Sequence, residues 1–170
     1  MASFYVVSRR VRAVVMLGSL LSVASFAQTA GQIVGWTVSV APKTAVPQGD
    51  KATLELSAEV QEGWHVYALT QVPGGPTPLH VTLDDNAAIR SAGEPSGSNP
   101  KKKHDPSFDL DTQFYEQSFV LRVPVLVKEQ AVPGKQVIPV SVRLQACSDR
   151  TCLPPRTIHL SVPIVITPKT

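Results

Sequence analysis

The sequence predicts an all-β fold, an immunoglobulin-like antiparallel β-sandwich. Six short segments alternate apolar with polar residues or are rich in β-branched residues. Clusters of proline, glycine, aspartate and asparagine separate these segments. The chain has 15 prolines among 170 residues, and no stretch beyond residue 27 keeps a helical period for three turns. Short strands between frequent turns are typical of a β-sandwich.

The six strand candidates follow one another between clear turn signals. Residues 33–40 (IVGWTVSV) and 52–60 (ATLELSAEV) flank the turn at 47–50, and residues 79–83 (LHVTL) lie between turns at 73–76 and 84–86. The last three candidates are 119–127 (FVLRVPVLV), 137–144 (VIPVSVRL) and 157–167 (TIHLSVPIVIT). They contain Pro124, Pro139 and Pro163, which indicates edge strands or bulges. Residues 91–109 (SAGEPSGSNPKKKHDPSFD) are expected to form one long mobile loop.

The first 27 residues have the pattern of a secretory signal peptide. Arg9, Arg10 and Arg12 precede an apolar run at 13–24, and residues 25–27 (SFA) form a small-x-small cleavage site. The run is shorter than the roughly 18 residues of a membrane-spanning helix. We therefore expect one soluble domain at 28–170, without a membrane span, in the periplasm or otherwise exported.

Removal of this leader changes the charge of the chain. Without its three arginines, 13 basic residues remain against 13 acidic ones, and the net charge of +3 falls to zero. The only basic cluster is Lys101-Lys102-Lys103, and no aromatic residues alternate with it. Stacking aromatics and a basic surface are what nucleic-acid binding requires, so we expect a solvated loop and no nucleic-acid partner.

Cys147 and Cys152 are the only cysteines. In an exported protein, two cysteines most simply form one intramolecular disulfide. A bond across so short a loop stabilises the fold by only about 2 kcal/mol in the chain-entropy model. A short exposed turn would also leave the sulfurs open to thiols, as in labile disulfides. The residues alone leave both a redox-active and a structural disulfide open.

Three segments resemble, in the same order, the amino-terminal periplasmic domain of the thiol:disulfide interchange protein DsbD. Residues 144–155 (LQACSDRTCLPP) resemble its active-site hairpin, 63–67 (GWHVY) its glycine-aromatic-x-x-tyrosine strand, and 111–116 (DTQFYE) its cap loop. The likeness extends over about residues 33–167. It implies an immunoglobulin-like fold, in agreement with the strand pattern.

The resemblance implies roles for six residues. Cys147 and Cys152 correspond to the redox pair, in which Cys152 forms the mixed disulfide with a partner and Cys147 resolves it. Phe114, with Tyr115, corresponds to the cap that shields the disulfide. Tyr67 and His65 correspond to residues that line the sulfur site.

The family also implies partners. Its domain receives electrons from a thioredoxin-like domain and passes them to oxidised periplasmic proteins, including disulfide isomerases and cytochrome c maturation factors. The chain ends at Thr170 without the family's membrane domain, so we expect the donor, thioredoxin-like or a membrane electron carrier, to be a separate chain.

Two features of this chain depart from the family pattern. Four residues separate the cysteines, whereas the best-known member has five, and Thr112-Gln113 replaces an acidic pair before the cap aromatic. We interpret the chain as a thiol:disulfide interchange domain of oxidoreductase type that needs no cofactor and no metal. The alternative is a non-catalytic adaptor with a structural disulfide.

Overall fold

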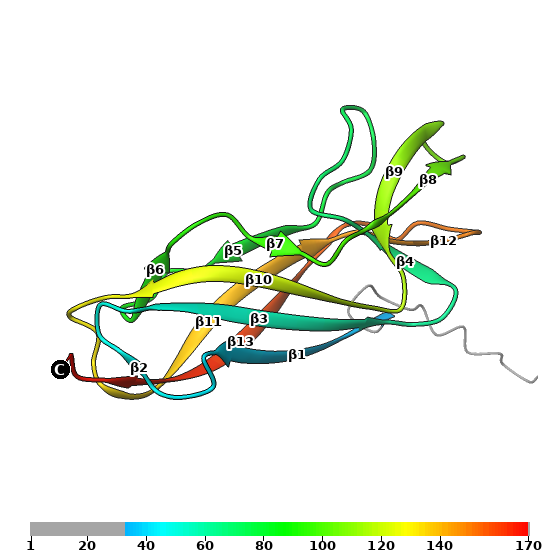
Figure 1. The fold of residues 1–170 in the computed structure, drawn as a ribbon. Helices are drawn as coiled ribbons and strands as arrows, with labels where there is room; N and C mark the ends of the chain where they lie inside the picture. Colours follow the sequence, from blue (N-terminus) through cyan, green and yellow to red (C-terminus); the bar gives the residue numbers. More distant parts are fainter. Residues whose placement is uncertain (1–32, 170) are drawn as a thin grey trace, which may run out of the picture.

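The computed structural model describes residues 33–169. The predicted signal peptide, residues 1–27, and the start of the predicted domain lie outside this range. The described residues form thirteen strands in three sheets (Figure 1). Two of the sheets pack as an antiparallel sandwich of immunoglobulin-like type, which confirms the predicted fold class.

The first sheet of the sandwich has the order β1-β3-β10-β6, and β7 also pairs with β10. All of its pairings are antiparallel. Its strands are β1 (Val34–Ala41), β3 (Lys51–Val60), β6 (Ile89–Ser91), β7 (Ser96–Gly97) and β10 (Ser118–Val127).

The second sheet has the order β2-β13-β11-β5 and is antiparallel except for the short parallel pairing of β13 with β2. Its strands are β2 (Val46–Pro47), β5 (His80–Leu83), β11 (Gly134–Leu144) and β13 (Arg156–Thr167). All six strand segments predicted from the alternating pattern are strands here, with bounds that differ by three residues at most.

The core lies between these two sheets because every second residue of the long strands points inward. Leu54 and Leu56 of β3, Leu121 of β10, and Val140 and Val142 of β11 are completely buried in one continuous cluster. Burial of each such side chain stabilises the fold by about 2 kcal/mol. The sandwich is therefore a firm support for the smaller sheet at its end.

The third sheet is small and has the order β12-β4-β9-β8. It lies at the end of the sandwich opposite the carboxyl terminus (Figure 1). Val66, Tyr115 and Ala146 on its inner face join the main core. Its strands are β4 (Trp64–Tyr67), β8 (Lys101–Asp105), β9 (Leu110–Tyr115) and β12 (Ala146–Ser148).

The prediction of one long mobile loop at 91–109 is wrong. This stretch contains β7 and β8, and β8 (Lys101–Asp105) pairs along its whole length with β9. Its lysines are exposed, so no alternation of apolar residues marks the strand. The backbone ladder with β9 holds it in place, and lysines on an edge strand discourage pairing with other chains.

The prediction that prolines mark edges or bulges is wrong for Pro124 and Pro139, which lie on the inner strands β10 and β11. Their carbonyls accept hydrogen bonds from the N–H groups of Ala92 and Asp84, just beyond the ends of β6 and β5. A strand residue directs its nitrogen and its carbonyl to the same neighbour. The missing N–H of each proline thus faces a point where a short partner strand stops.

Candidate functional site

Cys147 and Cys152 form a disulfide between directly opposed residues of one hairpin. Their sulfurs are 2.07 Å apart and their Cα atoms 4.0 Å apart. Backbone hydrogen bonds flank the pair on both sides, at 2.8 Å from Ser148 to Thr151 and at 2.9 Å from Leu153 to Ala146. This is the pattern around a non-hydrogen-bonded antiparallel pair, in which side chains approach most closely. The hairpin backbone therefore brings the two sulfurs together.

Ser148 shapes the turn between the cysteines. Its hydroxyl oxygen accepts the backbone N–H groups of Arg150 at 3.3 Å and Thr151 at 3.2 Å, as serine does at the start of turns. Pro154 and Pro155 follow, and they fix the backbone before β13 begins. Four intervening residues are thus enough to close this hairpin.

His65, Cys147 and Cys152 lie in one row across three neighbouring backbone segments. Cys147 of β12 is the register partner of His65 on β4, and it is also the bridge partner of Cys152. Side chains of directly opposed residues leave the same face of a sheet. All three therefore project from the outer face of the small sheet, away from the main core.

Aromatic side chains cover the buried half of this disulfide. Cys147 is 1% exposed and packs with Tyr67 and Phe114, while Phe108 and the half-buried Cys152 lie at the margin of the same cluster. Tyr67 is fully buried and Phe114 is 6% exposed. A nucleophile from solvent therefore meets Cys152 before Cys147.

The cap is a β-hairpin rather than a loop, because Phe114 lies within β9 and the chain turns back at 105–110. Asp105 organises this turn: its Oδ1 accepts the N–H of Ser107 at 2.9 Å and its carbonyl accepts the N–H of Phe108 at 3.2 Å. Phe108 then meets the Tyr67 ring edge-on, with ring centroids 5.9 Å apart. The hairpin tip is thereby folded onto the disulfide cluster.

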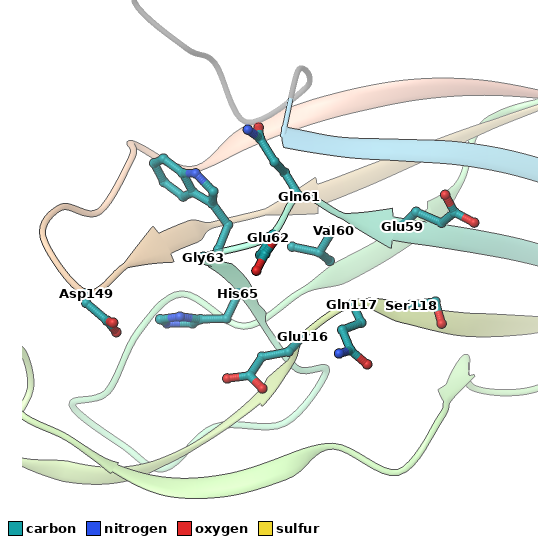
Figure 2. Close-up of a pocket in the computed structure, with 11 residues that line it drawn as sticks. Glu59, Val60, Gln61, Glu62, Gly63, His65, Glu116, Gln117, Ser118 and Asp149 are labelled. Carbon is teal, nitrogen blue, oxygen red and sulfur yellow. The ribbon is translucent and has the colours of Figure 1, made fainter.

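Two cavities meet at His65, and one of them borders the disulfide. One has a volume of about 470 Å³ and is lined by Cys147, its aromatic neighbours and the β8–β9 hairpin. The other, of about 600 Å³, is shown in Figure 2 and is lined by the acidic residues Glu59, Glu62, Glu116 and Asp149. His65 lines both.

The protonation of three groups is shifted at the site. Burial raises the pKa of the Tyr67 hydroxyl, and its hydrogen bond to Asp105 raises it further. Partial burial of Asp105 opposes its charge, but hydrogen bonds from Tyr67 and Ser107 outweigh this and lower its pKa. Burial lowers the pKa of His65, although nearby carboxylates partly offset the effect. At neutral pH these shifts favour a neutral tyrosine, an ionised aspartate and a neutral imidazole.

The structure brings most of the residues singled out from the sequence together. Phe114, Tyr67 and His65 surround Cys147, and His65 contacts both aromatic rings at centroid distances of 5.1–5.2 Å. Tyr115 is not among them. It points into the main core and stacks on Phe119 with ring centroids 4.3 Å apart, because neighbouring residues of a strand face opposite sides.

Sequence reasoning missed Phe108 and Asp105. Both lie in the stretch interpreted as a mobile loop. The segment Asp-Pro-Ser-Phe-Asp is a strong turn signal, and an isolated aromatic within a polar turn could have indicated a residue that is partly buried.

Thr112 and Gln113, which stand where the family has an acidic pair, contribute to the packing and hydrogen bonding of β9. The Thr112 side chain is buried, and the backbone N–H and carbonyl of Gln113 form hydrogen bonds with the side-chain amide of Gln71.

Within residues 33–169, no three His, Cys, Asp or Glu side chains are grouped closely enough to hold a metal ion. Over the same part of the chain, no helix has the length and apolar character needed to cross a bilayer.

Comparison with solved structures found similar chains of low sequence identity. The reduced DsbD amino-terminal domain of Neisseria meningitidis is 17% identical, covers 64% of this chain and 74% of its own, and has a TM-score of 0.45. The amino-terminal periplasmic domain of ScsB from Proteus mirabilis is 15% identical, with 78% and 45% covered and a TM-score of 0.46. The pilin subunit BcpA of Bacillus cereus is 14% identical, with 79% and 40% covered and a TM-score of 0.42.

No curated protein matched the sequence. A family model did: residues 37–163 match the one described as thiol:disulfide interchange protein DsbD, N-terminal. The matched range spans most of the chain and includes the disulfide, the aromatic cluster and the cap hairpin. The chain therefore belongs to the family of DsbD amino-terminal domains.

Proposed function

We propose that this domain carries out thiol-disulfide exchange in the periplasm through Cys147 and Cys152. The observation that carries the proposal is the asymmetry of the disulfide: Cys147 is 1% exposed beneath an aromatic cluster, and Cys152 is half-buried at its margin. Exchange needs one sulfur that a partner can reach and a second that is kept for resolution. The pair has that arrangement.

In the reducing half-reaction, a thiolate of the donor attacks Sγ of Cys152. The disulfide breaks, its electron pair leaves on Cys147, and a mixed disulfide forms between the donor and Cys152. A second donor thiol then releases the domain as a dithiol. Reversal of these steps on an oxidised client reduces the client and restores the Cys147–Cys152 bond, so electrons balance without a cofactor.

The family suggests the partners. The donor would be a thioredoxin-like domain or a membrane electron carrier, and the clients would be oxidised periplasmic proteins such as disulfide isomerases and cytochrome c maturation factors. Phe114 would shield the sulfurs between encounters, since it packs directly against Cys147. Docking of a partner would have to displace the β8–β9 hairpin or approach beside it, at Cys152.

A reduction potential tests the proposal. The purified domain is equilibrated with glutathione or dithiothreitol mixtures, and the fraction of free thiol is measured by alkylation. Exchange-active pairs lie between about −230 and −120 mV, and structural disulfides below roughly −300 mV. We expect the first range. A value in the second would overturn the proposal and favour an adaptor that binds through an oxidised hairpin.

A further inference from the structure

The strand register sets His65 beside the sulfur that must act as the internal nucleophile. His65 and Cys147 are directly opposed on β4 and β12. The Cβ atoms of such a pair are about 5 Å apart, within reach of an imidazole ring. Both side chains also line the same cavity of about 470 Å³.

Packing holds the imidazole at the cavity that Cys147 also lines. The His65 ring meets Tyr67 edge-on at a centroid distance of 5.2 Å and lies tilted against Phe114 at 5.1 Å. Tyr67 and Phe114 are the two buried rings that contact Cys147. A ring held by these two contacts has little freedom to leave the cavity.

Charges from every neighbouring element face His65. In Figure 2 the ring lies between Asp149, from the cysteine hairpin, and Glu116, which follows β9. Asp105 and Lys103 face it from β8. Burial outweighs the attraction of the three carboxylates, so the pKa of His65 falls below its ordinary value of 6.5. The imidazole is then neutral at neutral pH, in the form that accepts a proton.

Other groups near the sulfur are less suited to this task. The Tyr67 hydroxyl already donates a hydrogen bond to Asp105 at 2.7 Å, and its raised pKa keeps it protonated. That bond also occupies Oδ2 of Asp105 and lowers the basicity of its carboxylate. Glu116 and Asp149 are exposed.

We propose that His65 is the proton acceptor for Cys147 in the resolving step, an inference that rests on the proposed exchange function. In the mixed disulfide between Cys152 and a client, Cys147 is a buried thiol. Its Sγ proton passes to the imidazole, and the thiolate attacks Sγ of Cys152. The Cys147–Cys152 bond forms, the bond from Cys152 to the client breaks, and the client leaves as a thiolate. The imidazolium then releases this proton to solvent, because the pKa of His65 lies below neutral pH. The Cys147 thiolate released on reduction by a donor takes up a proton from solvent.

A chromogenic disulfide reagent distinguishes attack by Cys152 from resolution by Cys147. The reduced full domain is mixed with 5,5′-dithiobis(2-nitrobenzoate): attack by Cys152 releases a first coloured thiolate, and resolution by Cys147 releases a second. In the wild type, we expect the second phase to rise with pH through an inflection below 6.5, the ordinary pKa of His65. In H65Q, this inflection should vanish and the second phase should slow about tenfold or more near neutral pH, a modest general-base effect.

Further variants separate proton transfer from packing. H65F keeps an aromatic ring against Tyr67 and Phe114, and it should slow the second phase as H65Q does. In H65A, free imidazole should restore the rate by entering the vacated space. H104Q, at an exposed histidine of the same cavity, should match the wild type.

The outcomes are distinct. If the wild type releases the second thiolate and H65Q and H65F do so with the same rate and pH profile, the role of His65 is overturned. The exchange function would then still stand. A wild type that never releases the second thiolate would overturn the exchange function as well.

Discussion

The hydroxyl of Tyr67 donates a 2.7 Å hydrogen bond to Oδ2 of Asp105. Tyr67 lies at the end of β4, within the disulfide cluster, and Asp105 lies at the end of β8, where the cap hairpin turns. This bond therefore ties the disulfide cluster to the cap hairpin. Its strength should set how readily the hairpin lifts.

Tyr67→Phe removes this tie and keeps the ring. A hydrogen bond to a charged group at a partly buried site contributes about 1–2 kcal/mol, and its loss should favour an open hairpin. We expect the disulfide to be reduced several-fold faster by dithiothreitol, as followed by alkylation and mass spectrometry. Tyr115→Phe, on the core side of β9, is the matched control and should keep the wild-type rate. An equal increase in the rate of reduction in both variants would contradict this role of the Tyr67–Asp105 hydrogen bond.

Phe114→Ala should uncover Cys147. Truncation of a buried phenylalanine destabilises a protein by about 3 kcal/mol, and here it also opens space beside the buried sulfur. We expect faster reduction together with a lower free energy of unfolding, measured by urea titration. Phe108→Ala is the matched control: Phe108 is less buried and does not cover Cys147 as closely, so both effects should be smaller. A larger acceleration in Phe108→Ala would move the cap role to the hairpin tip.

The sandwich could be predicted because its long strands bury one face. Alternate residues of β3, β10, β11 and β13 are apolar, and the period of two is visible in the sequence. β8 could not be predicted in this way. All three of its lysines are exposed and only its backbone pairs, so its existence depends on β9 rather than on its own side chains.

The cysteine count led to Cys147 and Cys152, and resemblance added Tyr67, Phe114 and His65; all five share the outer face of the small sheet. Resemblance also placed Tyr115 beside Phe114 in a cap loop, where both side chains could turn to one side. Neighbouring residues of a strand face opposite sides, so Phe114 packs against Cys147 and Tyr115 packs into the main core. Asp105 is nearly forty residues from Tyr67 in sequence, and only the fold of the hairpin brings the two together.

The two cysteines should differ in reactivity when separated. In Cys147→Ala the remaining Cys152 is half-buried, whereas in Cys152→Ala the remaining Cys147 lies beneath Tyr67 and Phe114. We expect Cys152 to react much faster with iodoacetamide, and Cys147→Ala to trap partner proteins from periplasmic extract. Each variant loses the same disulfide, worth about 2 kcal/mol, so the loss of the bond itself is matched. Faster alkylation of Cys147 would reverse the assigned order of attack.

Acid should destabilise the fold in two windows. The pKa of His65 is lower in the folded state than its ordinary 6.5, so the unfolded chain binds more protons as the pH falls below 6.5. The stability from its neutral form is complete above that pH and is lost as the pH falls through the folded pKa. The pKa of Asp105 is likewise lowered from 3.8, and the same argument gives a second loss below that value.

Urea titrations of His65→Gln and Asp105→Asn across this pH range should separate the windows. His65→Gln should reduce the dependence of the free energy of unfolding on pH just below pH 6.5. It should leave the loss of stability below pH 3.8 unchanged. Asp105→Asn should be less stable than the wild type at neutral pH, by about 1 kcal/mol for the weakened bond to Tyr67, and should converge with it in acid. His104→Gln, at an exposed ring, should follow the wild type throughout. A wild type that gains stability from neutral pH toward pH 5 or so would contradict the direction of the His65 shift, because that shift predicts more protons on the unfolded chain in this range.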